Sequence, residues 1–385
     1  NGNFYRIFAF GSLIDRVFFL RIFSVLLGAA TVCLTYLLAK ELISEKHFFA
    51  VTAAIIVAFH PTFSVVSSTV SPDILAIFLT SAFTLFGVKI LKNIKVDFKT
   101  LFLFLSTLIL GILTRFTNFA LIGASVVPLF RKKILLLILL LISSFGIFLI
   151  FLRSPGMLGE FAQFFSKPPT FSPLSFFNFA TASFGHYNSE VFSWYWAVFG
   201  WLEASLPVFA YRVLRVLAIL SILGLITYLF SWFKKPNFGQ DFQVWLFLLV
   251  VIVVTATGVV LFDWQTFTRT GIGFGVQGRH FLTAVSAQMV FFVVGITILL
   301  AKLKIPEKLV LTGLSLWFIF LNFLSIWVIT NFFYQTTNFS QLILRASQYK
   351  PDFFKGNWLI FWLGIFLVYQ LIFLIKFLFQ IARSK

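Results

Sequence analysis

Three long apolar runs constrain this chain more than any other feature. They extend over Ile134–Leu152, Val244–Phe262 and Trp358–Ile375. A helix crosses the hydrocarbon core of a bilayer with about 20 apolar residues, and each run approaches or reaches that length. Hydrophobic residues make up 60% of the chain and charged residues 11%, whereas soluble domains are typically about half apolar and a quarter charged. The sequence therefore predicts an all-α polytopic membrane protein and excludes a water-soluble one.

The hydropathy pattern predicts about eleven membrane segments in a single transmembrane domain over residues 1–385. We expect them near 17–39, 48–66, 73–91, 101–114, 116–130, 134–152, 208–232, 242–262, 281–301, 309–330 and 358–380. Two of them, 101–114 and 116–130, are short. By length alone this pair fits either one long helix or two short passes.

Lysine-rich connections decide between these two topologies. Cytoplasmic loops of membrane proteins are enriched in Lys and Arg, and all the short basic connections fall on one side only if the pair crosses twice. These connections contain Lys40 and Lys46; Lys89, Lys92, Lys95 and Lys99; Arg131, Lys132 and Lys133; Lys234 and Lys235; Lys302, Lys304 and Lys308; and Arg383 and Lys385. We therefore expect a hairpin with Arg115 at its outer tip, and a cytoplasmic C-terminus.

Arginine is distributed differently from lysine along this topology. Most arginines fall on the outer side or at an outer helix end: Arg6, Arg16, Arg21, Arg115, Arg153, Arg212, Arg215, Arg269, Arg279 and Arg345. A guanidinium grips phosphate in a bidentate fashion and stays charged when partly buried. A single arginine can equally extend to the head groups, but together they indicate an anionic ligand near the outer leaflet. With this explanation the net charge of +18 requires no nucleic-acid partner.

Loop lengths and rare residues complete the outline. The largest predicted loop, 153–206, is external, which places the working face of the protein outside the cytoplasm. The single Cys33 excludes an intrachain disulfide. No pattern typical of a metal site is present, so we predict no metal ligands and no cofactor. Dependence on a divalent metal is the alternative. The chain starts at Asn1, and we expect a further N-terminal part to precede it.

Two short motifs carry candidate polar groups on the outer side. Ser71-Pro72-Asp73 opens a segment, where Pro and Asp suit a helix start but a carboxylate could equally assist in catalysis or bind an acceptor hydroxyl. His60-Pro61 lies at the outer part of the preceding segment. The pair favours a kink or helix end, and His60 is alternatively a sugar or acceptor ligand.

A second group of motifs suits an anion. Arg115 lies at the break between two short segments, where an uncompensated charge is costly. The run Gly271-Ile-Gly-Phe-Gly-Val-Gln-Gly-Arg-His280 precedes another segment. Its glycines permit close backbone approach, and the following helix start favours an anion. We therefore expect Arg115, Arg269, Arg279 and His280 to bind a donor phosphate, and Gln277 to bind the sugar or the acceptor; an irregular loop without a ligand is the alternative.

Aromatic residues end the large outer loop. Trp194-Tyr-Trp196 is followed by Trp201 and Glu203. An aromatic belt at the membrane interface explains this composition. Trp201 and Glu203 could instead stack on and hydrogen-bond a sugar, and the sequence does not separate the two interpretations.

Several of these stretches resemble GT-C membrane glycosyltransferases. The resemblance is carried by Arg21-Ile-Phe-Ser-Val-Leu-Leu-Gly28, Leu37-Leu-Ala-Lys-Glu-Leu42, Phe59-His-Pro61, Ser71-Pro-Asp73-Ile-Leu75 and Gly111-Ile-Leu-Thr-Arg115-Phe-Thr117. These are similar to protein mannosyltransferases and lipid A aminoarabinose transferases. Phe199-Gly-Trp201 and Gln277-Gly-Arg279 resemble more closely a less characterised bacterial branch of that superfamily.

The resemblance implies a GT-C-like bundle that transfers a sugar from a polyprenyl-phosphate donor to a glycan, lipid or protein acceptor on the extracytoplasmic face. It places the principal catalytic carboxylate before residue 1, with Asp73 assisting. It further implies an integral protein of a bacterial inner membrane, in contact with membrane lipids. A lipid-linked glycan flippase and a glycan polymerase or ligase are the alternatives, although few charges lie within the predicted spans.

Overall fold

The fold is known from a computed structural model, which describes residues 13–43, 47–93, 96–130, 172–200, 202–233, 240–271, 276–336, 338–348 and 350–383. Its first half contains α2 (Leu13–Leu42), α3 (His47–Ala58), α4 (Pro61–Ser68), α5 (Pro72–Lys92), α6 (Phe98–Thr114), η1 (Phe116–Ala120) and α7 (Leu121–Phe130). A second group follows with α10 (Pro173–His186), η2 (Tyr187–Val191), α11 (Phe192–Trp196), β1 (Val198–Phe199) and β2 (Ala204–Ser205). The remaining elements are α12 (Val208–Phe233), α13 (Gln240–Thr270), η3 (Gly278–Ala284), α14 (Val285–Lys302), α15 (Glu307–Tyr334), α16 (Phe339–Ser347), η4 (Asp352–Phe354) and α17 (Asn357–Arg383).

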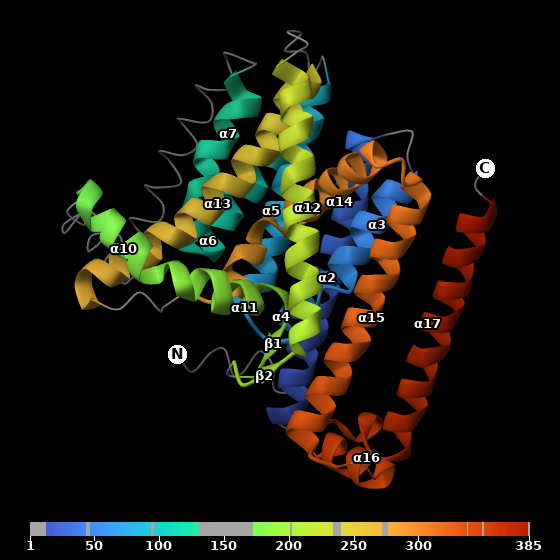
Figure 1. The fold of residues 1–385 in the computed structure, drawn as a ribbon. Coiled ribbons are helices and arrows are strands. Elements are labelled where there is room, and N and C mark those ends of the chain that lie inside the picture. The colour runs from blue at the N-terminus through green and yellow to red at the C-terminus, as the bar shows by residue number, and fades with distance from the viewer. Residues whose placement is uncertain are drawn as a thin grey trace.

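The helical bundle confirms an all-α polytopic membrane protein (Figure 1). In the described part of the chain, seven helices are long and apolar enough to cross a membrane, or eight if the bent pair α3–α4 counts as one span. Two shorter apolar helices cover 98–114 and 117–129, which matches the predicted short pair. The predicted segment 134–152 lies outside the described residues.

Successive long helices alternate in direction, so their ends collect at two faces of the bundle (Figure 1). One end holds α16 and the start of α2, and we call it the site end. The opposite end holds the close of α5, where Lys92 Nζ donates a hydrogen bond to the Glu41 carbonyl at the close of α2. Lys89 and Lys92 lie in the last turn of α5, and Lys302 ends α14. These three lysines therefore lie at the end opposite to the site end.

Hydroxyl contacts and aromatic rings fill the centre of the bundle. Ser286 on α14 lies between α2 and α5, with 2.7 Å from its Oγ to Thr35 Oγ1 and 2.8 Å to Ser81 Oγ. Phe83 stacks on Phe104 with ring centroids 4.6 Å apart. Small hydroxyl residues allow close helix approach and supply interhelical hydrogen bonds in a membrane. These contacts join α2, α5 and α14 into one core.

The predicted segment 48–66 is a bent pair of helices that together are long and apolar enough for one span. α3 and α4 meet at a break and are bent by 61° relative to each other. Pro61 begins α4, and proline cannot supply the backbone N–H that a continuous helix requires. The kink interpretation of His60-Pro61 is therefore confirmed. His60 closes the gap, because its Nδ1 accepts a hydrogen bond from the Phe63 amide, 3.4 Å away.

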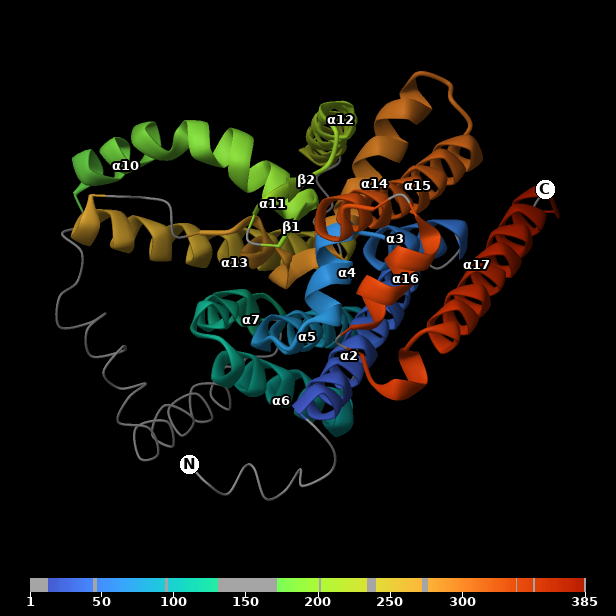
Figure 2. The same ribbon diagram turned by 90° about the horizontal axis from the view of Figure 1, so that it is seen from below.

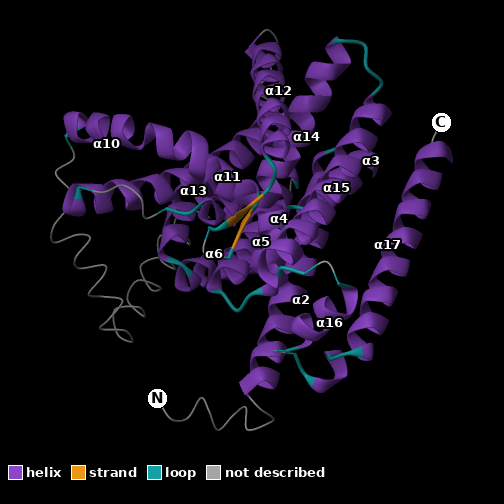
Figure 3. Ribbon diagram, turned by 60° about the horizontal axis from the view of Figure 1, so that its bottom comes forward, coloured by secondary structure: helices purple, strands orange, loops and turns teal. Residues whose placement is uncertain are grey.

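The described part of the large loop forms a helical arm and a hairpin. α10, η2 and α11 form the helical arm, which runs beside α13 (Figure 2). Trp264 Nε1 on α13 donates a hydrogen bond to Ser175 Oγ on α10 at 3.3 Å. β1 and β2 pair antiparallel, with Val198 opposite Ser205, and they are the strands of the described chain (Figure 3). Gly200 turns the hairpin with φ +66°, a conformation that favours glycine.

Candidate functional site

Asp73 occupies the first turn of α5 at the site end of the bundle. Ser71 caps this helix, and its Oγ accepts the Asp73 amide hydrogen bond at 3.1 Å. Pro72 fills the first helical position, where a missing N–H costs nothing. The Asp73 side chain is held at a helix N-terminus, which stabilises a negative charge, and is 11% exposed. The local sequence thus presents one shielded carboxylate at the start of a membrane helix.

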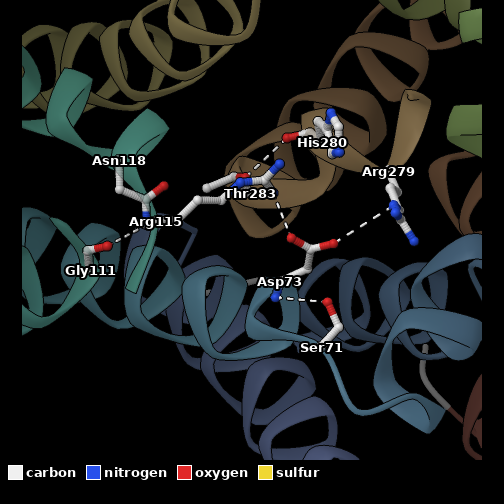
Figure 4. A network of polar contacts seen from close by, with 8 residues as sticks. All are labelled: Ser71, Asp73, Gly111, Arg115, Asn118, Arg279, His280 and Thr283. Atoms are coloured by element: carbon white, nitrogen blue, oxygen red, sulfur yellow. Dashed lines mark hydrogen bonds and ion pairs between the residues drawn. The ribbon is translucent and has the colours of Figure 1, made fainter. Parts of the chain in front are cut away.

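Arg115 lies at the break between α6 and η1 and points at this carboxylate. Its Nη1 is 2.8 Å from Asp73 Oδ1, and its side chain is 17% exposed. Asn118 fixes the break through two hydrogen bonds. Its side-chain Nδ2 donates to the Gly111 carbonyl at 3.1 Å, and its backbone N–H donates to the Arg115 carbonyl at 3.0 Å. The predicted hairpin tip is therefore confirmed as a break between two helices, and it places Arg115 at the ion pair (Figure 4).

Arg279 approaches the same carboxylate from η3. Its Nε lies 3.8 Å from Asp73 Oδ2, and 48% of its side chain is exposed. His280 follows it in the chain and lies near the two arginines (Figure 4). Thr283 Oγ1 donates to the His280 carbonyl at 3.0 Å, which ties the first turns of η3 together.

The charges of this cluster do not balance. One carboxylate faces two guanidiniums, so these three groups carry a net charge of about +1. Arg115 makes the short contact and is shielded, whereas Arg279 makes a long one and remains half exposed. In the described chain, the Nη atoms of Arg279 have no protein partner. The cluster can therefore accept an anion on the side of Arg279, and guanidinium groups suit a phosphate in particular.

The helical arm sets the position of η3. Gly278 begins this element, and a Cβ added there would overlap the backbone of Trp194 and Tyr195 in α11. Behind η3 lies a cavity of about 330 Å³ whose lining is almost wholly apolar; it is formed by Tyr187, Val191, Phe192, Tyr195, Trp196 and Phe281. Phe281 follows His280 directly, so the cluster around Asp73 and the cavity share η3 as a wall.

Two tyrosine hydroxyls at this cavity donate hydrogen bonds to polar side chains of the bundle. Tyr195 Oη donates to Gln288 Oε1 at 2.8 Å, and Tyr187 Oη donates to Asp263 Oδ2 at 2.9 Å. Burial raises the pKa of Tyr187, and the charge of Asp263 raises it further. The hydroxyl therefore stays protonated as a donor. Asp263 is fully buried in α13, and its Oδ1 has no partner among the described residues.

Other predicted ligands are not brought to Asp73 by any described contact. The backbone of Arg269 lies in the last turn of α13, but its side chain lies outside the described residues, as do residue Trp201 and positions 272–275. Gln277 precedes η3, and its carbonyl accepts the His280 amide. Glu203 is exposed at the end of the β-hairpin turn.

His60 and Trp196 lie in the core. His60 is 0% exposed and stacks on Trp196 with ring centroids 5.0 Å apart, while Tyr195 meets it edge-on. Trp196 is also buried, so it lies inside the fold, unlike a residue of an interfacial belt. The imidazole thus joins the kink of α3–α4 to the helical arm, and no face of it is open to a ligand.

The comparison with known proteins concerns the first part of the chain. Residues 4–154 match the family model of dolichyl-phosphate-mannose-protein mannosyltransferases. The motif resemblance to GT-C glycosyltransferases is confirmed over this stretch. The matched stretch is less than half of the chain, and it contains Asp73 and Arg115 but not Arg279. No curated protein and no solved structure matches the chain.

This family consists of membrane glycosyltransferases of GT-C type, which implies a lipid-linked sugar donor and an acceptor. Among the described residues, no group of three His, Cys, Asp or Glu side chains could hold a metal ion. Sequence reasoning missed Asn118, Tyr187 and Asp263, whereas the close backbone approach at Gly278 was expected from the glycine-rich run. Asp263 lies one residue beyond the predicted segment 242–262, whereas α13 extends past it to Thr270, so only the structure shows that this carboxylate is buried in a helix.

Proposed function

We propose that this protein transfers a sugar from a polyprenyl-phosphate donor to an acceptor on the extracytoplasmic face of a bacterial inner membrane. The observation that carries this proposal is the uncompensated positive charge at Asp73, Arg115 and Arg279. In such a transfer the bond between the sugar and the carrier phosphate breaks, and negative charge develops on the phosphate. Guanidinium groups held in place before the reaction stabilise that charge.

The two arginines have different parts in this proposal. Arg115 is fixed by its short contact with Asp73 and forms the shielded side of the site. Arg279 is half exposed and has free N–H groups, so it binds the carrier phosphate directly. Asp73 then acts as the positioning carboxylate that keeps two like charges together, because without it their repulsion would separate them.

The cavity behind η3 supports a lipid-linked donor rather than a soluble sugar nucleotide. Its wall is apolar, and the hydroxyls of Tyr187 and Tyr195 are occupied by Asp263 and Gln288. An apolar cavity next to a cationic cluster fits the isoprenoid chain and the phosphate of one molecule. A flippase is less well supported, because hydroxyl contacts such as Thr35–Ser286 close the centre of the bundle. A polymerase or ligase shares this site and differs in its acceptor.

Binding of polyprenyl monophosphate tests the proposal without knowledge of the sugar. Arg279→Ala should weaken binding to the purified protein by about ten- to a hundredfold, since a charge-assisted contact contributes roughly 1.5–3 kcal/mol. Arg115→Ala should weaken binding as well. Arg115→Lys should keep only part of the wild-type affinity, because lysine lacks the bidentate fork of arginine. Lys302→Ala at the opposite end is the matched control.

The same variants should lower turnover once a donor sugar has been found by testing a panel of polyprenyl-phosphate sugars. Loss in turnover as well as in affinity is expected if the phosphate is the leaving group. Unchanged binding of polyprenyl monophosphate in both Arg279→Ala and Arg115→Ala would contradict the proposal. Equal loss in Lys302→Ala would show a non-specific charge effect and would contradict it too.

A further inference from the structure

A second cationic cluster lies at the site end, between α2 and the connection from α16 to α17. Aromatic contacts bring the two segments together, since the Phe18 ring lies 5.4 Å from Phe353 and 5.2 Å from Phe354, between centroids. Arg21 is one helical turn beyond Phe18, and Lys350 precedes Phe353 by three residues. Residues from opposite ends of the chain thus place two cations near each other.

No carboxylate of the described chain forms an ion pair with these cations. The nearby Asp352 is 2.8 Å from Lys355 Nζ and almost fully exposed. Arg16, further towards the start of α2, has a buried Nε without a hydrogen-bond partner among the described residues. Burial lowers the pKa of Lys350, and the charge of Arg21 lowers it further. Like charges held together in a folded protein repel, so an external anion would relieve this arrangement.

The surroundings of the cluster are apolar and exposed. α16 crosses the site end between α15 and α17 (Figures 1 and 3). Its Ile343 and Ser347 are buried, whereas Phe339 and Leu344 are exposed, at 59% and 74%. A short helix that exposes two large apolar side chains among polar ones, with cations beside it, fits a segment that lies in the head-group region of a bilayer. An anion that reaches Lys350 there is most readily part of a lipid.

We propose that Arg21 and Lys350 bind the phosphate of an anionic phospholipid, at a site separate from the Asp73 cluster. Arg21 supplies the planar fork that matches phosphate oxygens, and Lys350 supplies a point charge. The exposed Leu344 and Phe339 contact the acyl chains. Bound lipid would hold α2 against the α16–α17 connection and stabilise the folded protein. The site does not depend on the proposed transferase activity.

Thermal unfolding of the full chain in a neutral detergent tests this site. Added phosphatidylglycerol should raise the Tm of the wild-type protein, because a ligand that binds only the folded state stabilises it. Phosphatidylcholine and inorganic phosphate are the comparison probes. Arg21→Gln and Lys350→Gln should each weaken the response to phosphatidylglycerol by about tenfold or more in lipid concentration. Lys302→Gln at the opposite end should respond like wild type.

Lys350→Arg keeps the charge and should keep the response, which separates loss of binding from loss of folding. An unchanged phosphatidylglycerol response in both glutamine variants would overturn the proposal. An equal rise in Tm with inorganic phosphate would show a free-anion site and would overturn the lipid assignment. A response to phosphatidylcholine as large as that to phosphatidylglycerol would exclude recognition of the charge.

Discussion

Arg115 Nη1 lies 2.8 Å from Asp73 Oδ1, so an ion pair joins the break after α6 to the first turn of α5. Both side chains are largely shielded. A shielded pair of this kind holds its geometry, because separating the charges leaves each in an environment that solvates it poorly. The pair therefore fixes two helix ends and one face of the candidate phosphate site at the same time.

Asp73 and Arg115 should be energetically coupled. Removing one partner of a buried pair costs about 3–5 kcal/mol because the other charge is left uncompensated. We expect Asp73→Ala and Arg115→Ala each to lower the free energy of unfolding, and the double variant to lose about 0.5–3 kcal/mol less than their sum. Chemical unfolding of the four proteins in detergent measures this. Additive losses would show that the two residues act independently.

Gly278 should tolerate no side chain. In Gly278→Ala the new Cβ would overlap the backbone of Trp194 and Tyr195, and backbone cannot move aside as a flexible side chain can. Overpacking typically costs about 1–3 kcal/mol, and the displacement of η3 would move Arg279 from Asp73. We expect a lower Tm and weaker polyprenyl-phosphate binding. Gly313→Ala, where a Cβ meets open space, is the control and should bind normally. Wild-type binding in Gly278→Ala would be inconsistent with η3 as the carrier of the phosphate ligand.

Tyr187 should stabilise the fold through its hydroxyl. Tyr187→Phe removes the donor to Asp263 Oδ2 and leaves a fully buried carboxyl group without a partner in the described chain. Such a loss costs about 1–3 kcal/mol, measurable as a lower Tm. Combining it with Asp263→Leu should recover much of the loss, because an apolar pair needs no hydrogen bond. Tyr369→Phe on the exposed side of α17 is the control. If Tyr187→Phe and the control Tyr369→Phe unfold at the same Tm, the Tyr187 hydroxyl does not stabilise the fold.

The orientation in the membrane should place the site end outside the cytoplasm. With Cys33→Ser as background, Thr336→Cys at the site end should react with a membrane-impermeant maleimide in intact spheroplasts. Lys304→Cys, in the turn between α14 and α15, should react only after lysis. The physical reason is the lysine enrichment of the end opposite to the site. Labelling of Lys304→Cys before lysis would reverse the orientation.

Helix positions were predictable because hydropathy is a local property. The predicted segments 17–39 and 73–91 coincide with α2 and α5 to within a few residues. The kink at His60-Pro61 divided the segment 48–66, and the proline that causes it was visible in the sequence. The β-hairpin at 198–205 was not predicted, since two-residue strands carry too short a pattern to detect.

The sequence by itself determined the class of protein and the separation of charges. Apolar runs of this length exclude water as the solvent of the fold, and the placement of lysines distinguishes the two ends, since both properties belong to short stretches of chain. Tertiary structure alone decided which polar groups meet. It paired Asp73 with Arg115 and Arg279, and it buried His60 against Trp196. These partners are far apart in the chain, and only the packing of helices fixes which side chains meet.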